Sequence, residues 1–148
     1  SFDLIIDAID SVDCKAGLIL GATEAGVPLV SSMGAALRTD PFAIRKAEFW
    51  EVDGDPLARM LRKRYRQTKE FPSHKFMCVY SCELPRENRG AMAEESMSAG
   101  SSTKAKINGT MAHVTIMFGT ALAGLVIEGV ERSLRAQCAD ACVPAKDN

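Results

Sequence analysis

The stretch FDLIIDAIDSV, residues 2–12, decides the expected fold. Its aliphatic centre, Leu4 to Ile6, is typical of a strand buried on both faces in the middle of a parallel sheet. Either Asp10 or Ser11 can cap the helix that we expect to follow and to run to about Ala25. A second apolar run at 27–31 then completes a strand–helix–strand unit, in which the two strands are parallel with a right-handed crossover.

The position of this first strand leaves two interpretations open. Strands of this kind usually have partners on both sides, and here none precedes it. Either the strand simply starts the domain, or the chain is the second half of a larger fold.

The rest of the chain predicts a single α/β domain. Apolar spacing, caps and turn residues indicate a strand at 44–52, a helix at 55–69, a strand at 75–81, a long mobile loop at 86–109 and a helix at 110–136. We therefore expect one domain over residues 1–137 and a frayed tail over 138–148.

Composition excludes the disordered, collagen-like and coiled-coil classes of protein. The 148 residues are 47% apolar and 25% charged, which is the balance of a soluble globular domain. The net charge of −1 gives no global attraction to nucleic acid or membrane, so any nucleic-acid contact requires a local patch. An odd number of cysteines and no signal peptide favour a reducing, cytoplasmic location. The longest apolar run, 116–127, is too short to span a bilayer and predicts a buried helix.

Asp7 and Asp10 are the first candidates for chemistry. Ligands of parallel α/β sheets bind at the carboxyl ends of strands, where Asp10 is expected. A carboxylate there can hold a hydrated Mg²⁺ that bridges nucleotide phosphates. The alternative is that Asp10 only caps the helix that follows.

The cysteines give a weaker signal. Cys78 and Cys82 form one C-x₃-C pair, and Cys138 and Cys142 form another, so a structural zinc site is conceivable. An extended strand holds the first pair too far apart for one tetrahedral site, which disfavours zinc. A reactive Cys78 at the end of a strand is the other possibility.

One predicted helix is unusually basic. Its cations are not interrupted by any acid, and they are Arg59, Arg62, Lys63, Arg64, Arg66 and Lys69. A solvated helix face is the ordinary explanation, but like charges so close together repel one another and an RNA backbone would relieve this. Lys104 and Lys106 could add to such a surface.

Taken together, these residues resemble a known superfamily. FDLIIDAIDSV with Lys15-Ala16 and Val27-Pro28-Leu29-Val30 is similar to the second half of the ubiquitin-activating-like adenylating enzymes of the ThiF, MoeB and HesA type. The form "AIDSV..K" is similar to the tRNA threonylcarbamoyladenosine dehydratase branch. Further matching segments are Gly34-Ala35, Thr39-Asp40-Pro41, Asp55-Pro56-Leu57-Ala58, Cys78-Val79-Tyr80-Ser81 and Gly109-Thr110-Met111.

The resemblance implies a fold and an activity. It implies the C-terminal half of a Rossmann-like three-layer fold, and adenylation of a carboxylate by ATP and Mg²⁺, followed by cyclising dehydration of threonylcarbamoyladenosine in tRNA. Asp10 matches the aspartate that holds magnesium and the phosphates, and Cys78 matches a cysteine frequent in this branch. The cofactor-binding residues expected from the opening motif are Asp7, Asp10, Ser11 and Lys15. Family members are commonly dimers, so a homodimer is expected, and a sulfur-transfer protein is a further candidate partner.

The chain also departs from the family pattern. The glycine-rich loop and the nucleotide-gripping Arg and Lys residues lie N-terminal to the matched segment and are missing from it, so we expect this fragment to be inactive alone. Two alternatives stay open. One is an activator of a sulfur-carrier or ubiquitin-like protein, in which a cysteine accepts an acyl group. The other is a non-catalytic RNA-binding or dimerisation module.

Overall fold

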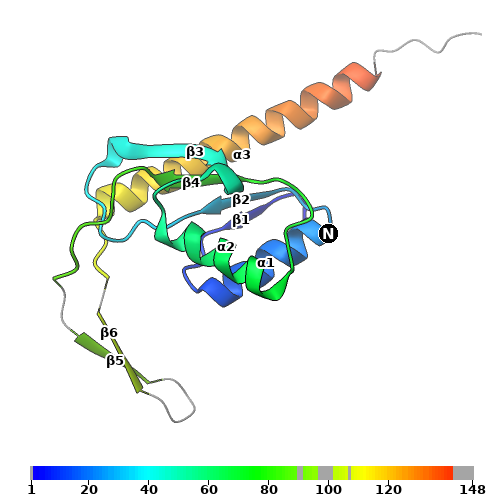
Figure 1. Cartoon of the computed structure of the whole chain (residues 1–148). Coiled ribbons are helices and arrows are strands. Elements are labelled where there is room, and N and C mark those ends of the chain that lie inside the picture. The colour runs from blue at the N-terminus through cyan, green and yellow to red at the C-terminus, as the bar shows by residue number, and fades with distance from the viewer. Residues whose placement is uncertain (1, 90–91, 97–101, 107, 142–148) are drawn as a thin grey trace, which may run out of the picture.

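A computed structural model of the chain describes residues 2–89, 92–96, 102–106 and 108–141 (Figure 1). Its strands are β1 (Ile5–Asp7), β2 (Leu29–Ser32), β3 (Ile44–Glu48), β4 (Met77–Ser81), β5 (Met92–Ser96) and β6 (Ser102–Lys106). Its α-helices are α1 (Val12–Glu24), α2 (Pro56–Thr68) and α3 (Ala112–Ala141), and short 3₁₀ turns lie at Pro41–Ala43 and Phe49–Glu51.

The main sheet has the strand order β1-β2-β4-β3. β1, β2 and β4 are parallel, and β3 is antiparallel at the far edge. The predicted parallel strand–helix–strand unit is therefore confirmed. The expectation that the first strand is buried on both faces is wrong for β1, because α3 packs across β2, β3 and β4 and leaves Ile6 54% exposed at the edge.

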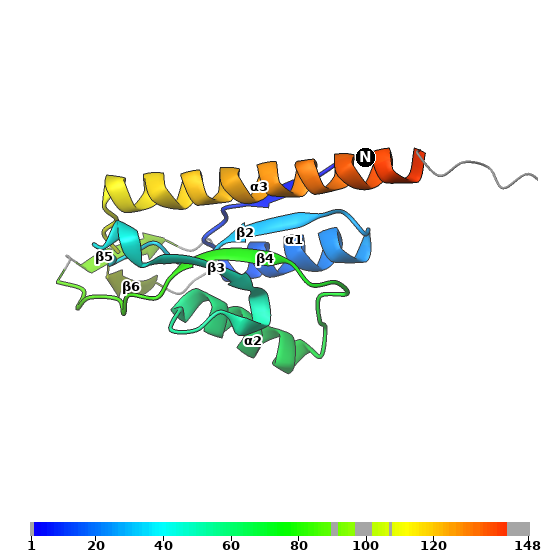
Figure 2. The same ribbon diagram turned by 90° about the horizontal axis from the view of Figure 1, so that it is seen from above.

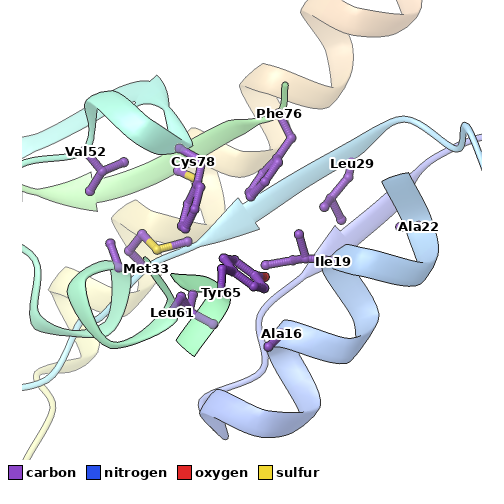
Figure 3. Packing of buried hydrophobic residues seen from close by; sticks show 12 residues of the cluster. Ala16, Ile19, Ala22, Leu29, Met33, Val52, Leu61, Tyr65, Phe76 and Cys78 are labelled. Carbon is purple, nitrogen blue, oxygen red and sulfur yellow. The ribbon is translucent and has the colours of Figure 1, made fainter. Parts of the chain in front are cut away.

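Helices cover both faces of this sheet. Figure 2 shows α1 and α2 on one side and α3 on the other, so the predicted three-layer α/β fold is confirmed. Between the sheet and the helix pair, Ile19 of α1 and Leu61 and Tyr65 of α2 pack with Phe76 and Cys78 (Figure 3). On the opposite face, Val30 and Val79 meet the buried side of α3.

α2 begins where the sequence predicts. The Asp55 side chain accepts a hydrogen bond from the Ala58 N–H at 2.8 Å, and Pro56 occupies the first turn, where a missing N–H costs nothing. The helix ends at Lys69, whose φ of 60° is left-handed.

α3 differs from its prediction in length and burial. Val114, Phe118, Leu122 and Leu125 are buried against the sheet, but beyond Leu125 every side chain that the structure describes is partly or fully exposed. The second half of the helix extends past the sheet (Figure 2). By length and composition alone, Ala112–Arg135 is long enough to cross a membrane, which corrects the expectation of a short buried run, and only 22% of its most apolar stretch is buried.

Two segments expected to lack regular structure contain some. Within 86–109, β5 and β6 pair as an antiparallel hairpin whose register places Glu94 opposite Lys104. Residues 90–91, 97–101 and 107 lie outside the described part. In the predicted tail, α3 continues to Ala141, and 142–148 lie outside the described residues.

Candidate functional site

A cavity of about 750 Å³ lies beside the carboxyl ends of β1 and β2. This is the end of a parallel sheet at which ligands bind, and the volume suits a small-molecule ligand. The wall comes from the segments after β1 and β2, from the first turns of α2, from residues before α3 and from the first half of α3. Its lining includes Ile9, Asp10, Met33, Gly34, Arg38, Leu57, Met60, Asn108, Thr115, Phe118 and Leu122.

A buried polar network fixes the segment that leads into the cavity. Asp7 at the end of β1 forms an ion pair of 2.6 Å with Lys15 of α1, and neither side chain is exposed. The Ser31 hydroxyl donates to the same carboxylate at 2.6 Å. The Ile9 N–H donates to Asp7 at 3.0 Å, and Lys15 donates to the Ile9 carbonyl at 3.2 Å. The network therefore holds the turn at Ile9, immediately before Asp10.

Three of the four residues expected to bind a cofactor do not line the cavity. Asp7 and Lys15 are fully buried, satisfy each other and do not line the cavity. Their observed contacts are those of positioning residues. Ser11 is exposed, and it does not line the cavity either.

Asp10 lies where a ligand can reach it. Its side chain is exposed and lines the cavity, and no hydrogen bond or ion pair holds it among the described residues. The capping alternative is wrong, because the N-cap of α1 is Ser11, and even there no side chain caps the helix. Asp10 is thus a carboxylate at the cavity whose side chain holds no other part of the described structure.

The donor set restricts what kind of metal ion fits. Among the described residues no group of three or more His, Cys, Asp or Glu side chains could enclose an ion. Mg²⁺ does not require such a cage, because it is commonly held by one or two carboxylates together with substrate phosphates and water. Asp10 fits that mode.

Arg38 is a site residue that the motif analysis missed. It follows β2, lines the cavity, and is only 1% exposed. Among the described residues, Nε, Nη1 and Nη2 have no hydrogen-bond partner, and Asp55 Oδ2 lies 3.7 Å from Nη2. The signal available in the sequence was a single cation within the Gly34–Pro41 segment, which does not reveal burial.

Cys78 lies away from the cavity. It is fully buried in the cluster between the sheet and α1 and α2 (Figure 3). Burial raises the pKa of its thiol far above the ordinary range, which disfavours the thiolate that acts as a nucleophile. Cys82 is exposed and its Sγ donates to the Ala43 carbonyl at 3.2 Å, and Cys142 lies outside the described residues.

Comparison with known proteins identifies homologues of this chain. No profile of a known family matches the chain. It is 30% identical over 137 residues to the tRNA threonylcarbamoyladenosine dehydratase of Haemophilus influenzae, covering 86% of this chain and 50% of that protein. Solved structures of the E. coli tRNA N6-threonylcarbamoyladenosine dehydratase with ATP and with AMP superpose with TM-scores of 0.68 and 0.69 at 26% and 27% identity. The chain is homologous to part of the tRNA threonylcarbamoyladenosine dehydratases.

The similarity covers most of this chain but only about half of the dehydratases. The alignments with the two E. coli dehydratase structures cover 91% of this chain and 51% of theirs. The chain thus spans about half the length of the dehydratases that it matches. Its α/β sheet and its three layers are those of the dehydratase fold over the matched part.

The cations of α2, the basic helix of this dehydratase homologue, fall into two groups. Arg62 donates to the Phe49 and Val52 carbonyls at 3.0 and 2.8 Å, and Arg64 pairs with Asp13 at 2.6 Å, so both have partners within the fold. The cations that stay exposed are Arg59, Lys63, Arg66 and Lys69. Met60 of the same helix lines the cavity, and none of these four cations is among its lining residues. Lys104 and Lys106 lie in β6, for which the structure describes only the backbone.

Proposed function

We propose that this chain carries part of the active site of an ATP-dependent tRNA threonylcarbamoyladenosine dehydratase. The observation that carries the proposal is the free Asp10 carboxylate at a cavity beside the carboxyl ends of β1 and β2. The homologous dehydratase structures with ATP and AMP support it, because these are the nucleotides before and after transfer of an adenylyl group.

The proposed reaction has two steps. An oxygen of the substrate carboxylate attacks the α-phosphorus of ATP, the bond to the β-phosphate oxygen breaks, and pyrophosphate leaves. A nucleophile within the same substrate then attacks the acyl carbon, loses its proton and expels AMP, which closes the ring. The carboxylate oxygen leaves with AMP, so the substrate loses the elements of water. Adenylation makes this possible because AMP is a far better leaving group than hydroxide.

Asp10 has a definable task in this scheme. With nucleotide oxygens and water it would hold Mg²⁺, which offsets the negative charge of the phosphates. The network of Asp7, Lys15 and Ser31 keeps the turn before Asp10 in one position, so the backbone that carries the Asp10 side chain is already ordered when the ligand arrives.

The exposed side of α2 is proposed to contact the tRNA backbone. Met60 of the same helix lines the cavity, so an RNA backbone bound along α2 would bring a nucleotide close to the cavity. Phosphate contacts of this kind hold the RNA in register without reading its sequence. We expect the protein to act in the cytoplasm, on tRNA that already carries the threonylcarbamoyl group.

The alternative of a sulfur-carrier or ubiquitin-like protein activator finds less support. It requires a cysteine that can accept an acyl group, and Cys78 lies inside the core with a raised thiol pKa. We therefore do not assign Cys78 a covalent role or propose a sulfur-transfer partner.

The test is incubation of the intact protein with Mg²⁺, ATP and tRNA bearing threonylcarbamoyladenosine. We expect AMP release that depends on the modified tRNA, together with loss of one water from the modified nucleoside by mass spectrometry. Unmodified tRNA is the matched control. AMP release that is equal with both RNAs, or none with either, would contradict the proposal.

A further inference from the structure

The Arg38 guanidinium is buried without the partners that a buried charge requires. Its side chain is 1% exposed, and its Nε, Nη1 and Nη2 make no hydrogen bond within the part of the chain that the structure describes. Asp55 compensates the charge in part, with Oδ2 at 3.7 Å, beyond hydrogen-bond distance. The Asp55 oxygens already accept the N–H groups of Ala58 at 2.8 Å and Gly34 at 3.1 Å. N–H donors left unpaired in the interior are costly, so this group has capacity for a further acceptor.

The backbone around Arg38 is fixed on both sides. Leu37 has a left-handed φ of 60°, which is uncommon for a residue with a side chain. Its N–H donates to the Gly109 carbonyl at 3.0 Å, and its carbonyl accepts the Arg86 N–H at 2.9 Å. On the other side, the N–H groups of Thr39 and Asp40 donate to Glu83 at 2.8 and 2.9 Å. Arg38 is therefore presented from a held segment and is not a loosely placed surface cation.

The charge of the cavity indicates which anion it takes. Among the described lining residues the charged side chains are Asp10 and Arg38, and most of the others are apolar. A single guanidinium matches a single negative charge, and its planar donor arrangement matches the two oxygens of a carboxylate.

We infer that Arg38 binds the carboxylate of the substrate, the group that is to be adenylated. This inference rests on the proposed function and adds to it a residue that selects and orients the acid. Arg38 donates hydrogen bonds to the carboxylate oxygens, while Asp10 would hold the Mg²⁺ bound to the nucleotide. Each of the two charged side chains of the cavity thus has a different ligand. The competing assignment for the same anion-binding chemistry is a phosphate of the nucleotide.

The experiment separates these assignments with paired ligands. A short RNA hairpin bearing threonylcarbamoyladenosine is prepared with its carboxylate free and as the methyl ester, which removes the charge. Binding of both forms, and of ATP alone, is measured for the intact protein and for Arg38→Gln, Arg38→Lys and Arg45→Gln. Arg45 is the matched control because it is exposed on β3, outside the cavity lining, and donates to the nearby Phe42 and Ile44 carbonyls.

We expect the wild type and Arg45→Gln to prefer the free acid to the ester by roughly tenfold to a hundredfold, the usual range for a hydrogen bond to a charged group. Arg38→Gln should lose this preference and keep its affinity for ATP. Arg38→Lys, which retains charge without the planar donor pair, should keep part of the preference and also guards against failure of Arg38→Gln to fold.

Several results would overturn the inference. They are an equal affinity of the wild type for acid and ester, an unchanged preference in both Arg38 variants, or a loss confined to ATP, which would assign Arg38 to a phosphate. AMP release is measured separately. If the wild type forms AMP with modified tRNA and Arg38→Gln binds acid and ester as the wild type does, only this inference is refuted. Absence of AMP release refutes the proposed function itself.

Discussion

Asp7 and Lys15 form an ion pair of 2.6 Å in which both side chains are completely buried. The pair joins the end of β1 to the first turns of α1, and the Ser31 hydroxyl brings in β2. Bonds from both partners to Ile9 then hold the turn that carries Asp10 to the cavity. A buried charge pair thus fixes the backbone from which the exposed Asp10 side chain extends.

Breaking this pair on one side should be strongly destabilising. Asp7→Asn or Lys15→Met leaves an uncompensated charge in the interior, for which losses of about 3–5 kcal/mol are typical. The double variant should cost less than the sum of the single ones, because no lone charge remains. Urea denaturation of the intact protein measures this. Asp13→Asn, which disrupts the exposed pair with Arg64, is the control and should cost about 1 kcal/mol or less.

Asp10→Asn should separate function from stability. The side chain caps nothing and has no partner among the described residues, so the melting temperature should hardly change. Loss of the charge beside magnesium and the phosphates should reduce AMP formation roughly a hundredfold, on the order of 3 kcal/mol. Rates and melting curves of Asp10→Asn and Asp13→Asn provide the comparison. A rate within twofold of wild type would exclude Asp10 from the reaction.

The exposed cations of α2 should contribute to RNA binding through charge. Replacing Arg59, Lys63 and Arg66 by Gln should weaken tRNA binding and lower the slope of log K against log salt by about 2–3, at roughly 0.9 for each phosphate that is no longer neutralised. Fluorescence titrations at several salt concentrations measure the slope. Arg45→Gln should leave it unchanged. An unaltered slope in the triple variant would rule out this face of α2.

Glu83 should make the fold sensitive to acid. Hydrogen bonds from the Asp40 and Thr39 N–H groups and the Thr39 hydroxyl lower the pKa of Glu83 from 4.5 to about 2. A carboxylate with a lowered pKa stabilises the fold fully above about pH 4.5, and this stabilisation disappears as pH falls towards 2. Glu83→Gln should therefore melt below wild type at pH 7, and the gap should close on acidification.

Melting curves from pH 7 to low pH test this expectation. Glu24→Gln at the exposed end of α1 is the control and should stay close to wild type throughout. A gap between wild type and Glu83→Gln that is the same at every pH would contradict the role given to the ionised carboxylate.

The second half of α3 should mediate self-association. Ile127, Val130 and Leu134 are more than half exposed and lie three to four residues apart, so they form one apolar stripe beyond the sheet. We expect a dimer in sedimentation at tens of micromolar, where even weak contacts register. Ile127→Asp should shift it to monomer, and Ser133→Asp, outside the stripe, should not. Co-flotation with lipid vesicles would instead assign the stripe to a membrane.

Local patterns were sufficient to predict most elements. The Asp55-Pro56 pair marked the start of α2 because capping and the missing proline N–H act within one turn. The apolar runs that became β1 and β2, with α1 between them, indicated a parallel pair because that connection has few alternatives. The hairpin at β5 and β6 was missed because its strands lack an apolar alternation.

The sequence by itself determined the kinds of residue available at the site: the carboxylate of Asp10, a run of cations on α2, and the resemblance to adenylating enzymes. Tertiary structure alone decided what each does. Asp7 and Asp10 have the same side chain, yet Asp7 is buried with Lys15 and Ser31, whereas Asp10 is exposed at the cavity. Arg62 donates to backbone carbonyls, while Arg59 is exposed to solvent. Arg38 is buried, and its guanidinium makes no hydrogen bond among the described residues. The reason is physical: the role of a charge depends on its burial and its partners, and here these come from segments that only the fold brings together.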